Sequence, residues 1–229
     1  MGVLCCTESF LRFARRITPH PLTSPIENRR PLRTRSAKWA RSVAAALARR
    51  GVSPNFISVV GIGFAGGAAA LFFSLPTSLG LVLAAVCIQL RLLCNMLDGM
   101  VAVEGGLKSA SGDLYNEFPD RLQDSLILIA AGYAVGLPEL GWASALLATM
   151  TAHARAYGGA LKLAQDFRGP MAKQHRMFLI TLACLISAVE LSQRGSLISL
   201  EVALWMVVGG SAITWMRRLV NMKQKLEQG

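Results

Sequence analysis

Residues 55–75 read NFISVVGIGFAGGAAALFFSL and contain no charged side chain. A bilayer core about 30 Å thick is crossed by about 20 helical residues, so this stretch is long enough to span a membrane as one helix. Five further apolar stretches follow it, at residues 79–102, 113–136, 141–161, 177–191 and 197–215. The sequence therefore predicts an all-α integral membrane protein with six transmembrane helices.

The amino-acid composition supports this class. Of the 229 residues, 53% are apolar and 16% are charged, whereas soluble domains carry about 25% charged residues. The large apolar fraction excludes an intrinsically disordered chain, and five cysteines in a chain of this length exclude a small disulfide-rich scaffold. The 24 Lys and Arg exceed the 13 Asp and Glu, which gives a formal net charge of +11.

The basic residues lie almost entirely on one side of the predicted spans. If the N-terminus is cytoplasmic, the outer loops are residues 76–78, 137–140 and 192–196, and they contain a single basic residue, Arg194. Cytoplasmic loops carry an excess of Lys and Arg, so both termini are predicted to lie in the cytoplasm. Anionic lipid attracts each basic residue near the membrane surface by about 1 kcal/mol. The bilayer therefore accounts for the positive charge, and no nucleic-acid partner is expected.

The predicted domain organisation has three parts. Residues 1–35 hold four of the nine prolines and show no periodic apolar pattern, which indicates a basic, loosely ordered cytoplasmic arm. Residues 36–220 form the membrane domain, and residues 221–229 form a cytoplasmic tail. At the start of the membrane domain, residues 37–50 place apolar and basic side chains on opposite faces of a helix. This pattern is typical of an amphipathic helix that lies at the membrane interface.

Acidic residues gather at the predicted cytoplasmic ends of the second and third spans. Six of the thirteen fall within residues 98–124. An ionised side chain at the centre of a span costs about 2.5–3.5 kcal/mol, so such residues persist when they are paired, hydrated or bound to a cation. With 3.6 residues per turn, each span carries one polar stripe. The stripes are Arg91, Asn95, Asp98, Gly99 and Ala102 on the second span, and Asp113, Asn116, Glu117, Asp120 and Asp124 on the third.

The two stripes form a candidate site for a hard divalent cation. Carboxylate and amide oxygens, without His or Cys on the stripes, favour Mg²⁺ or Mn²⁺ over Zn²⁺. The small residues Gly99, Ala102 and Gly112 leave room for a bulky ligand to approach the backbone. The alternative is that the acidic groups are solvated helix ends paired with nearby basic residues, which often contribute little to stability. An ordered set on two adjacent helices favours the metal site.

This segment resembles the signature of the CDP-alcohol phosphatidyltransferases, integral membrane enzymes with six spans and a preceding interfacial helix. The family pattern is D-x2-D-G-x2-A-R, then about eight residues, then G-x3-D-x3-D. Every spacing is kept, and five of the eight fixed positions match, namely Asp98, Gly99, Ala102, Gly112 and Asp120. The departures are Asn95 for the first Asp, Val103 for the Arg and Asn116 for the third Asp.

The resemblance implies a reaction and a set of roles. Enzymes of this family transfer a phosphatidyl group from CDP-diacylglycerol to an alcohol and release CMP, with two divalent ions at the diphosphate and the last Asp as the base. By matching position, Asp120 is the expected general base, and the expected metal ligands are Asn95, Asp98, Asn116 and Asp120. Gly99, Ala102 and Gly112 are expected to line the CDP pocket. The basic residues Arg155, Arg168, Lys173 and Arg176 are expected to bind the polar or phosphate group of the acceptor. The family also implies a homodimer.

The departures from the family pattern reduce the charge of the site. Four acidic positions carry a formal charge of −4 in the family, and the two asparagines leave −2 here, while Val103 also removes one positive charge. Asp113 and Glu117, close to Asn116 on the third span, are candidate compensating carboxylates.

Two other functions stay open at the level of sequence. The asparagines are also compatible with a non-catalytic relative that binds CDP-lipid or metal as a regulatory partner. A small transporter with buried carboxylates ranks lower, because the chain lacks the inverted repeats and broken helices that transporters often show. The sequence does not specify the acceptor alcohol.

Overall fold

The structure is a computed structural model that describes residues 37–74, 77–104, 112–164 and 166–228. For residue 104 and residues 112–116 it describes the backbone alone. The predicted cytoplasmic arm, residues 1–35, lies outside the described residues.

The described residues form seven α-helices and no strand. The helices are α2 (Lys38–Arg49), α3 (Pro54–Phe73), α4 (Ser78–Glu104), α5 (Gly112–Ala134), α6 (Pro138–Ala160), α7 (Lys173–Arg194) and α8 (Ile198–Glu227). Local sequence sets several of the ends. Ser53 caps α3 by accepting a hydrogen bond from the Phe56 amide at 3.2 Å, and Pro54 takes the first helical position. Gly195 ends α7 with φ 64°, a left-handed conformation that glycine adopts without strain.

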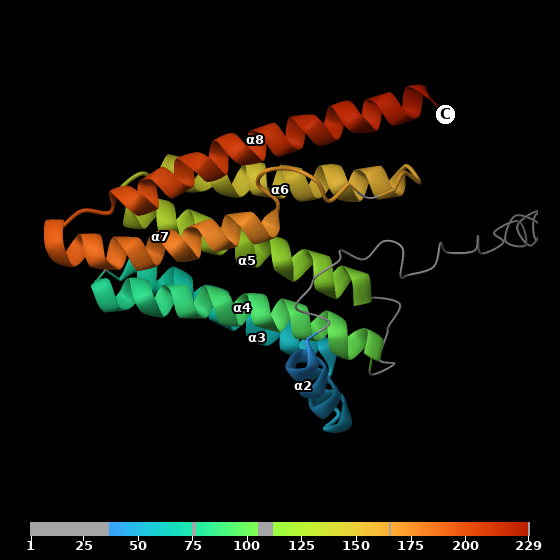
Figure 1. Cartoon of the computed structure of the whole chain (residues 1–229), viewed down its shortest axis with the longest axis horizontal. Coiled ribbons are helices and arrows are strands. Elements are labelled where there is room, and N and C mark those ends of the chain that lie inside the picture. The colour runs from blue at the N-terminus through green and yellow to red at the C-terminus, as the bar shows by residue number, and fades with distance from the viewer. Residues whose placement is uncertain (1–36, 75–76, 105–111, 165, 229) are drawn as a thin grey trace, which may run out of the picture. The chain divides into compact units, whose positions relative to one another are not determined.

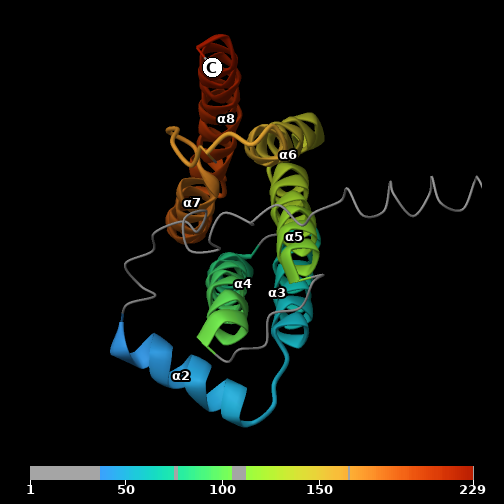
Figure 2. The same ribbon diagram turned by 90° about the vertical axis from the view of Figure 1, so that its right-hand side faces the viewer.

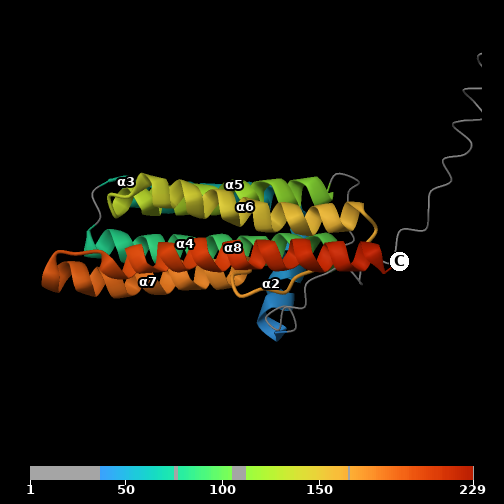
Figure 3. The same ribbon diagram turned by 90° about the horizontal axis from the view of Figure 1, so that it is seen from above.

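Six of the described helices close into a ring. Helix α3 packs against α4 and α5, α4 packs against α7, α7 against α8, α8 against α6, and α6 against α5. Figure 2 shows the ring with its helices seen nearly end-on. In Figure 3 the ring separates into two layers, one of α3, α5 and α6 and the other of α4, α7 and α8. Helix α2 packs against α4 and runs across the bundle rather than along it (Figure 1).

The core of the ring is rich in alanine, which lets the helices approach closely. Each of the six helices of the ring carries at least one buried alanine, namely Ala68, Ala84, Ala131, Ala148, Ala183 and Ala203. Helices α5 and α6 approach each other closely at Gly132 and Gly141. A Cβ atom on Gly141 would lie 2.8 Å from the Ile129 carbonyl oxygen and 3.0 Å from the Gly132 Cα. Both positions therefore require glycine.

The helices follow the predicted spans closely at most ends. Four of them, α3, α4, α7 and α8, are long and apolar enough to cross a membrane. Helices α5 and α6 fall short of that measure within the described residues, because α5 starts with the acidic stripe and α6 carries small and polar side chains such as His153 and Arg155. The number of six transmembrane helices thus stays a prediction.

Two helices are longer than the hydropathy pattern predicts. Helix α7 starts at Lys173 instead of residue 177, because its polar first turn finds partners on α5 instead of water. Helix α8 continues to Glu227, so most of the residues assigned to a tail after residue 220 extend the last helix.

The glycine contact between α5 and α6 predicts a position-specific loss of stability. Replacing Gly141 by Ala forces the two backbones apart, and overpacking of this kind costs about 1–3 kcal/mol. The matched control is Gly63→Ala, because a Cβ there meets nothing within 4 Å and alanine is the better helix former by about 1 kcal/mol. Thermal unfolding in detergent micelles should show a lower midpoint for Gly141→Ala alone. Equal midpoints in both variants would contradict the close helix contact.

Candidate functional site

A buried ion cluster joins three helices at the centre of the candidate site. Asp124 on α5 contacts Arg91 on α4, and its second carboxylate oxygen accepts a hydrogen bond from Arg176 Nη2 on α7 at 3.1 Å. The Arg91 side chain is fully buried, and those of Arg176 and Asp124 are 3% and 8% exposed. Arg176 also donates to the Met171 carbonyl oxygen at 2.9 Å. Charged groups this deep are stable only when each is paired.

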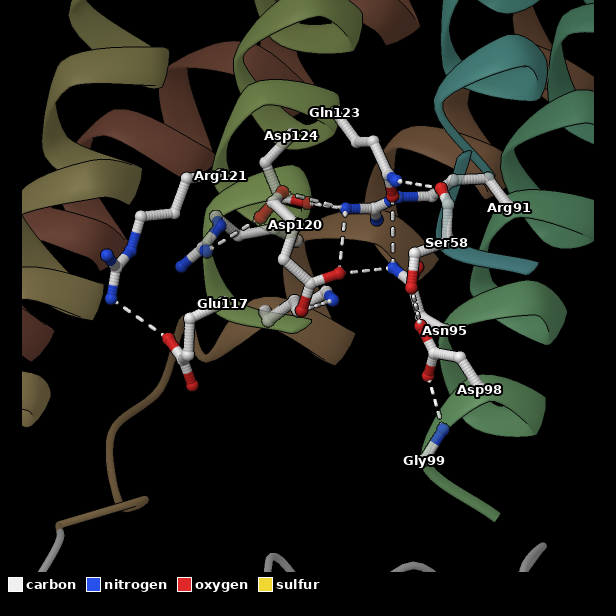
Figure 4. A network of polar contacts seen from close by, with 12 residues as sticks. Ser58, Arg91, Asn95, Asp98, Gly99, Glu117, Asp120, Arg121, Gln123 and Asp124 are labelled. Carbon is white, nitrogen blue, oxygen red and sulfur yellow. Dashed lines mark hydrogen bonds and ion pairs between the residues drawn. The ribbon is translucent and has the colours of Figure 1, made fainter. Parts of the chain in front are cut away.

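A polar relay connects the ion cluster to the predicted metal ligands. Gln123 Oε1 accepts hydrogen bonds from Arg91 Nε at 2.7 Å and from Asn95 Nδ2 at 3.1 Å, and Gln123 Nε2 donates to the Ser58 carbonyl oxygen at 3.3 Å. Asn95 Nδ2 also donates to Asp120 Oδ1 across the gap between α4 and α5 (Figure 4). The relay thus fixes the orientation of the Asn95 carboxamide.

Asp98 faces the first helix of the ring. Its Oδ2 accepts a hydrogen bond from Ser58 Oγ on α3 at 2.7 Å, and its Oδ1 accepts one from the Gly99 amide (Figure 4). Asp98 is only 3% exposed. Helix α3 can come this close because Gly61 has no side chain, and a Cβ there would lie 3.2 Å from Gln123 Nε2.

Asp120 is the most exposed of the three carboxylates Asp98, Asp120 and Asp124, and it is called the open carboxylate below. Its side chain is 27% exposed, and it forms an ion pair with Lys173 at the first position of α7. The Lys173 side chain is itself 25% exposed. Arg91 Nη2 donates to the backbone carbonyl of Asp120 at 3.1 Å. Asp120 therefore combines access from outside with a position fixed by α4 and α7.

A second group of charges lies one turn away on α5. Glu117 accepts hydrogen bonds from Arg155 on α6 at 2.5 and 2.7 Å. It also accepts one from Arg121 at 2.9 Å (Figure 4). The Arg155 guanidinium also stacks over the Phe167 ring, 5.5 Å from its centroid. Glu117 thus meets two arginines, and the expectation that it compensates for a lost metal ligand stays a prediction.

The C-terminal part of α8 makes hydrogen bonds to α6 and to the loop between α6 and α7. Arg218 Nη1 donates to the Thr151 carbonyl oxygen at 2.6 Å, and its Nε donates to the Arg168 carbonyl oxygen at 3.3 Å. Asn221 Nδ2 donates to Asp166 Oδ2 at 2.7 Å. Burial raises the pKa of the Asp166 carboxyl, but hydrogen bonds from the Arg168 amide and from Asn221 outweigh burial and hold this pKa below its usual value.

The predicted site residues fall into three groups: those that converge on one place, basic residues that pair elsewhere or are exposed, and residues at the facing ends of α4 and α5. Asn95, Asp98, Asp120 and Lys173 converge between α3, α4, α5 and α7, with Gly99 buried beside Asp98. Arg155 and Arg176 are drawn to Glu117 and Asp124, and the Arg168 side chain is 81% exposed. Ala102 lies one turn beyond Asp98 on α4 and is partly exposed. Gly112 starts α5, and the side chains of Asp113 and Asn116 lie outside the described set.

Two residues of the network are not evident from the predicted roles. Ser58 supplies a hydrogen bond to Asp98, and Gln123 links Arg91 with Asn95. For Ser58, the signal in the sequence is a polar residue inside an apolar span. For Gln123, the signal is its position three residues after Asp120, which puts both on the same face of the helix.

Solved structures share this fold. No family model and no curated protein matches the sequence. The Mycobacterium tuberculosis phosphatidylinositol phosphate synthase with CDP-DAG bound is 20% identical with a TM-score of 0.67, covering 81% of this chain and 94% of that one. The same synthase with manganese and citrate is 19% identical with a TM-score of 0.66, covering 80% and 88%. Its apo form gives 19%, 0.62, 78% and 93%. The likeness establishes the fold.

The ion cluster predicts that loss of one carboxylate destabilises the whole ring. Asp124→Asn removes the carboxylate that pairs with Arg176 and is the nearer of the two carboxylates paired with Arg91, and breaking a buried pair costs about 3–5 kcal/mol. The thermal unfolding midpoint in detergent micelles should fall well below that of the wild type. The control is Glu227→Gln, which removes an exposed partner of Lys223 at 3.6 Å and should leave the midpoint unchanged. The same midpoint for both variants would show that the cluster does not hold the helices.

Proposed function

We propose that the protein is a membrane transferase that moves a phosphatidyl group from CDP-diacylglycerol to a polar alcohol and releases CMP, as a step of phospholipid biosynthesis. The observation that carries the proposal is the convergence of Asp98, Asn95 and Asp120 between α3, α4 and α5, with one open carboxylate, Asp120, beside Lys173. A synthase of the same fold binds CDP-DAG, which supports the same class of donor here.

The proposed reaction is a displacement at phosphorus. The hydroxyl oxygen of the acceptor forms a bond to the phosphorus that carries the diacylglycerol. The bond from this phosphorus to the bridging oxygen breaks, and CMP leaves with that oxygen. Asp120 takes the hydroxyl proton, because it is the most exposed of the three carboxylates Asp98, Asp120 and Asp124 and is fixed by hydrogen bonds from neighbouring helices.

The described side chains fit one divalent cation better than two. Asp98 and Asp120 offer carboxylate oxygens, and Asn95 offers an amide group, which are donors that Mg²⁺ and Mn²⁺ accept. However, no group of three His, Cys, Asp or Glu suited to a metal occurs among the described residues. When bound, a divalent cation would neutralise charge on the diphosphate as a Lewis acid. The synthase of the same fold has been solved with manganese, and the choice between Mg²⁺ and Mn²⁺ is part of the test below.

Basic residues around Asp120 are proposed to hold the phosphate groups of the substrates. Lys173 contacts Asp120 directly, and Arg155 reaches Glu117 one turn away on α5. Arg168 extends from the loop before α7 and is largely exposed. Arg176 is buried against Asp124. Its proposed contribution to acceptor binding is to hold α7, which carries Lys173, against α5. Gly99, Ala102 and Gly112 are proposed to leave room for the CDP group.

The membrane placement is also part of the proposal. Helices α5 and α6 have 23 residues each, about 34 Å at 1.5 Å per residue, so all six helices of the ring are long enough to cross the bilayer. On α2, Ala40 and Ala44 face the protein while Trp39 and Val43 stay exposed, which supports an interfacial position. The excess of basic residues in the sequence supports a cytoplasmic location for both termini and for the site. The homodimer implied by the family resemblance is retained as a proposal.

The second candidate function is that of a non-catalytic relative that binds CDP-lipid or metal. The observation that favours it is Asn95, which occupies a family carboxylate position and here donates a hydrogen bond to Asp120. This candidate predicts no CMP release with any acceptor.

The transferase proposal predicts CMP release by the purified full chain from CDP-diacylglycerol. The assay uses Mg²⁺ or Mn²⁺ and a panel of acceptors that includes glycerol phosphate, inositol, inositol phosphate and serine. Asp120→Asn should lower the rate about 10²-fold or more, because general-base catalysis contributes about 10²–10⁴-fold. Asp98→Asn should also lower the rate, and Glu227→Gln should leave it unchanged. Thermal unfolding of each variant separates lost chemistry from lost folding.

Two results would overturn this assignment. Full activity in both Asp120→Asn and Asp98→Asn would show that the chemistry lies elsewhere. No activity in the wild type, with activity gained by Asn95→Asp combined with Asn116→Asp, would favour the non-catalytic relative.

A further inference from the structure

Both oxygens of the Asp120 carboxylate already have donors from the protein. Asn95 Nδ2 donates to Oδ1 and the Lys173 ammonium pairs with Oδ2. Lys173 reaches this oxygen from α7, whereas the two groups of the motif lie on α4 and α5. A positive charge is thus built into the wall of the site at its open carboxylate.

Three carboxylates and three cations of the site balance one another in number without any bound ion. The carboxylates of Asp98, Asp120 and Asp124 are matched by the three cations Arg91, Lys173 and Arg176. Sites for several divalent ions require a surplus of carboxylates, and the described part of this cluster has no surplus. The asparagine at position 95 removes the negative charge that would otherwise stand between Asp98 and Asp120.

Arg91 adds a second positive charge beside Asp120, which would repel a cation bound there. Its Nη2 lies 3.9 Å from Asp120 Oδ1, and its Nη1 is buried without a hydrogen-bond partner. A divalent ion that shared Asp120 would meet this guanidinium from α4 and the Lys173 ammonium from α7. Like charges at such separations repel strongly in a partly buried setting.

We propose that Lys173 supplies at Asp120 the positive charge that a second divalent cation would supply, so that the site binds no more than one divalent cation per chain. The ammonium then lies beside the carboxylate that receives the proton. The inference concerns the site of the proposed function, but it is tested by metal binding alone, without CDP-lipid. A failure of the transferase assay would therefore not decide the proposal about Lys173 and metal binding.

The test is a titration of the full chain in detergent micelles with Mn²⁺, in which electron paramagnetic resonance counts the free ion. The wild type should bind no more than one Mn²⁺ per chain. The double variant Asn95→Asp with Lys173→Met adds a carboxylate and removes the ammonium, and it should bind at least one Mn²⁺ more than the wild type. Lys173→Met alone should bind Mn²⁺ about tenfold more tightly, because one repelling charge is gone.

Two controls separate charge from general disturbance. Lys173→Arg keeps the positive charge and should retain the wild-type stoichiometry and affinity. Lys223→Met removes an exposed lysine of α8, 76% exposed, and should change neither value. If the Lys173→Met variants do not fold, the stoichiometry of the wild type and of Lys173→Arg still decides. Two Mn²⁺ bound per wild-type chain, or a folded double variant that binds no more than the wild type, would overturn the proposal.

Discussion

The pairing of one aspartate with two arginines inside the ring is the constraint on which the rest depends. Asp124 ties Arg91 of α4 and Arg176 of α7 to α5, and these three helices carry Asp98, Asp120 and Lys173. In a bilayer, moving any of the helices away would expose an unpaired charge to hydrocarbon, which is far more costly than separating apolar surfaces. The same pairing fixes Arg91, which in turn orients Gln123 and Asn95. Structure and site thus share one electrostatic anchor.

Much of the fold follows from hydropathy, and the differences have physical causes. The apolar stretch at residues 55–75 corresponds to α3, whose start is set by the cap Ser53 and by Pro54 at the first helical position. Helix α7 starts four residues before the predicted fifth span, because Lys173 and Arg176 count as polar in a sequence although they are paired with carboxylates of α5. Hydropathy measures transfer from water and has no term for partners that come from another helix. The end of α8 beyond residue 220 is largely exposed, and the apolar pattern of a span carries no signal for a solvated helical extension.

The candidate site was predictable in its parts and not in its connections. Helical spacing placed Asn95 with Asp98, and Asp120 with Asp124, on single faces of their helices. Spacing within one helix does not state which groups of different helices pair, and several basic residues compete for few carboxylates. The structure assigns Arg176 to Asp124 and Arg155 to Glu117, while Lys173 pairs with Asp120. That choice decides which cation stands at the open carboxylate.

The grip of α8 on the preceding loop makes the end of the chain part of the scaffold around the site. Arg218 and Asn221 lie beyond the apolar part of α8, yet they hold Arg168 and Asp166 in the segment that leads into Lys173. A chain shortened just after Trp215 would keep every predicted span and lose both clamps. The carboxyl-terminal turns of α8 therefore hold the segment that leads into Lys173, although they lie beyond the apolar part of that helix.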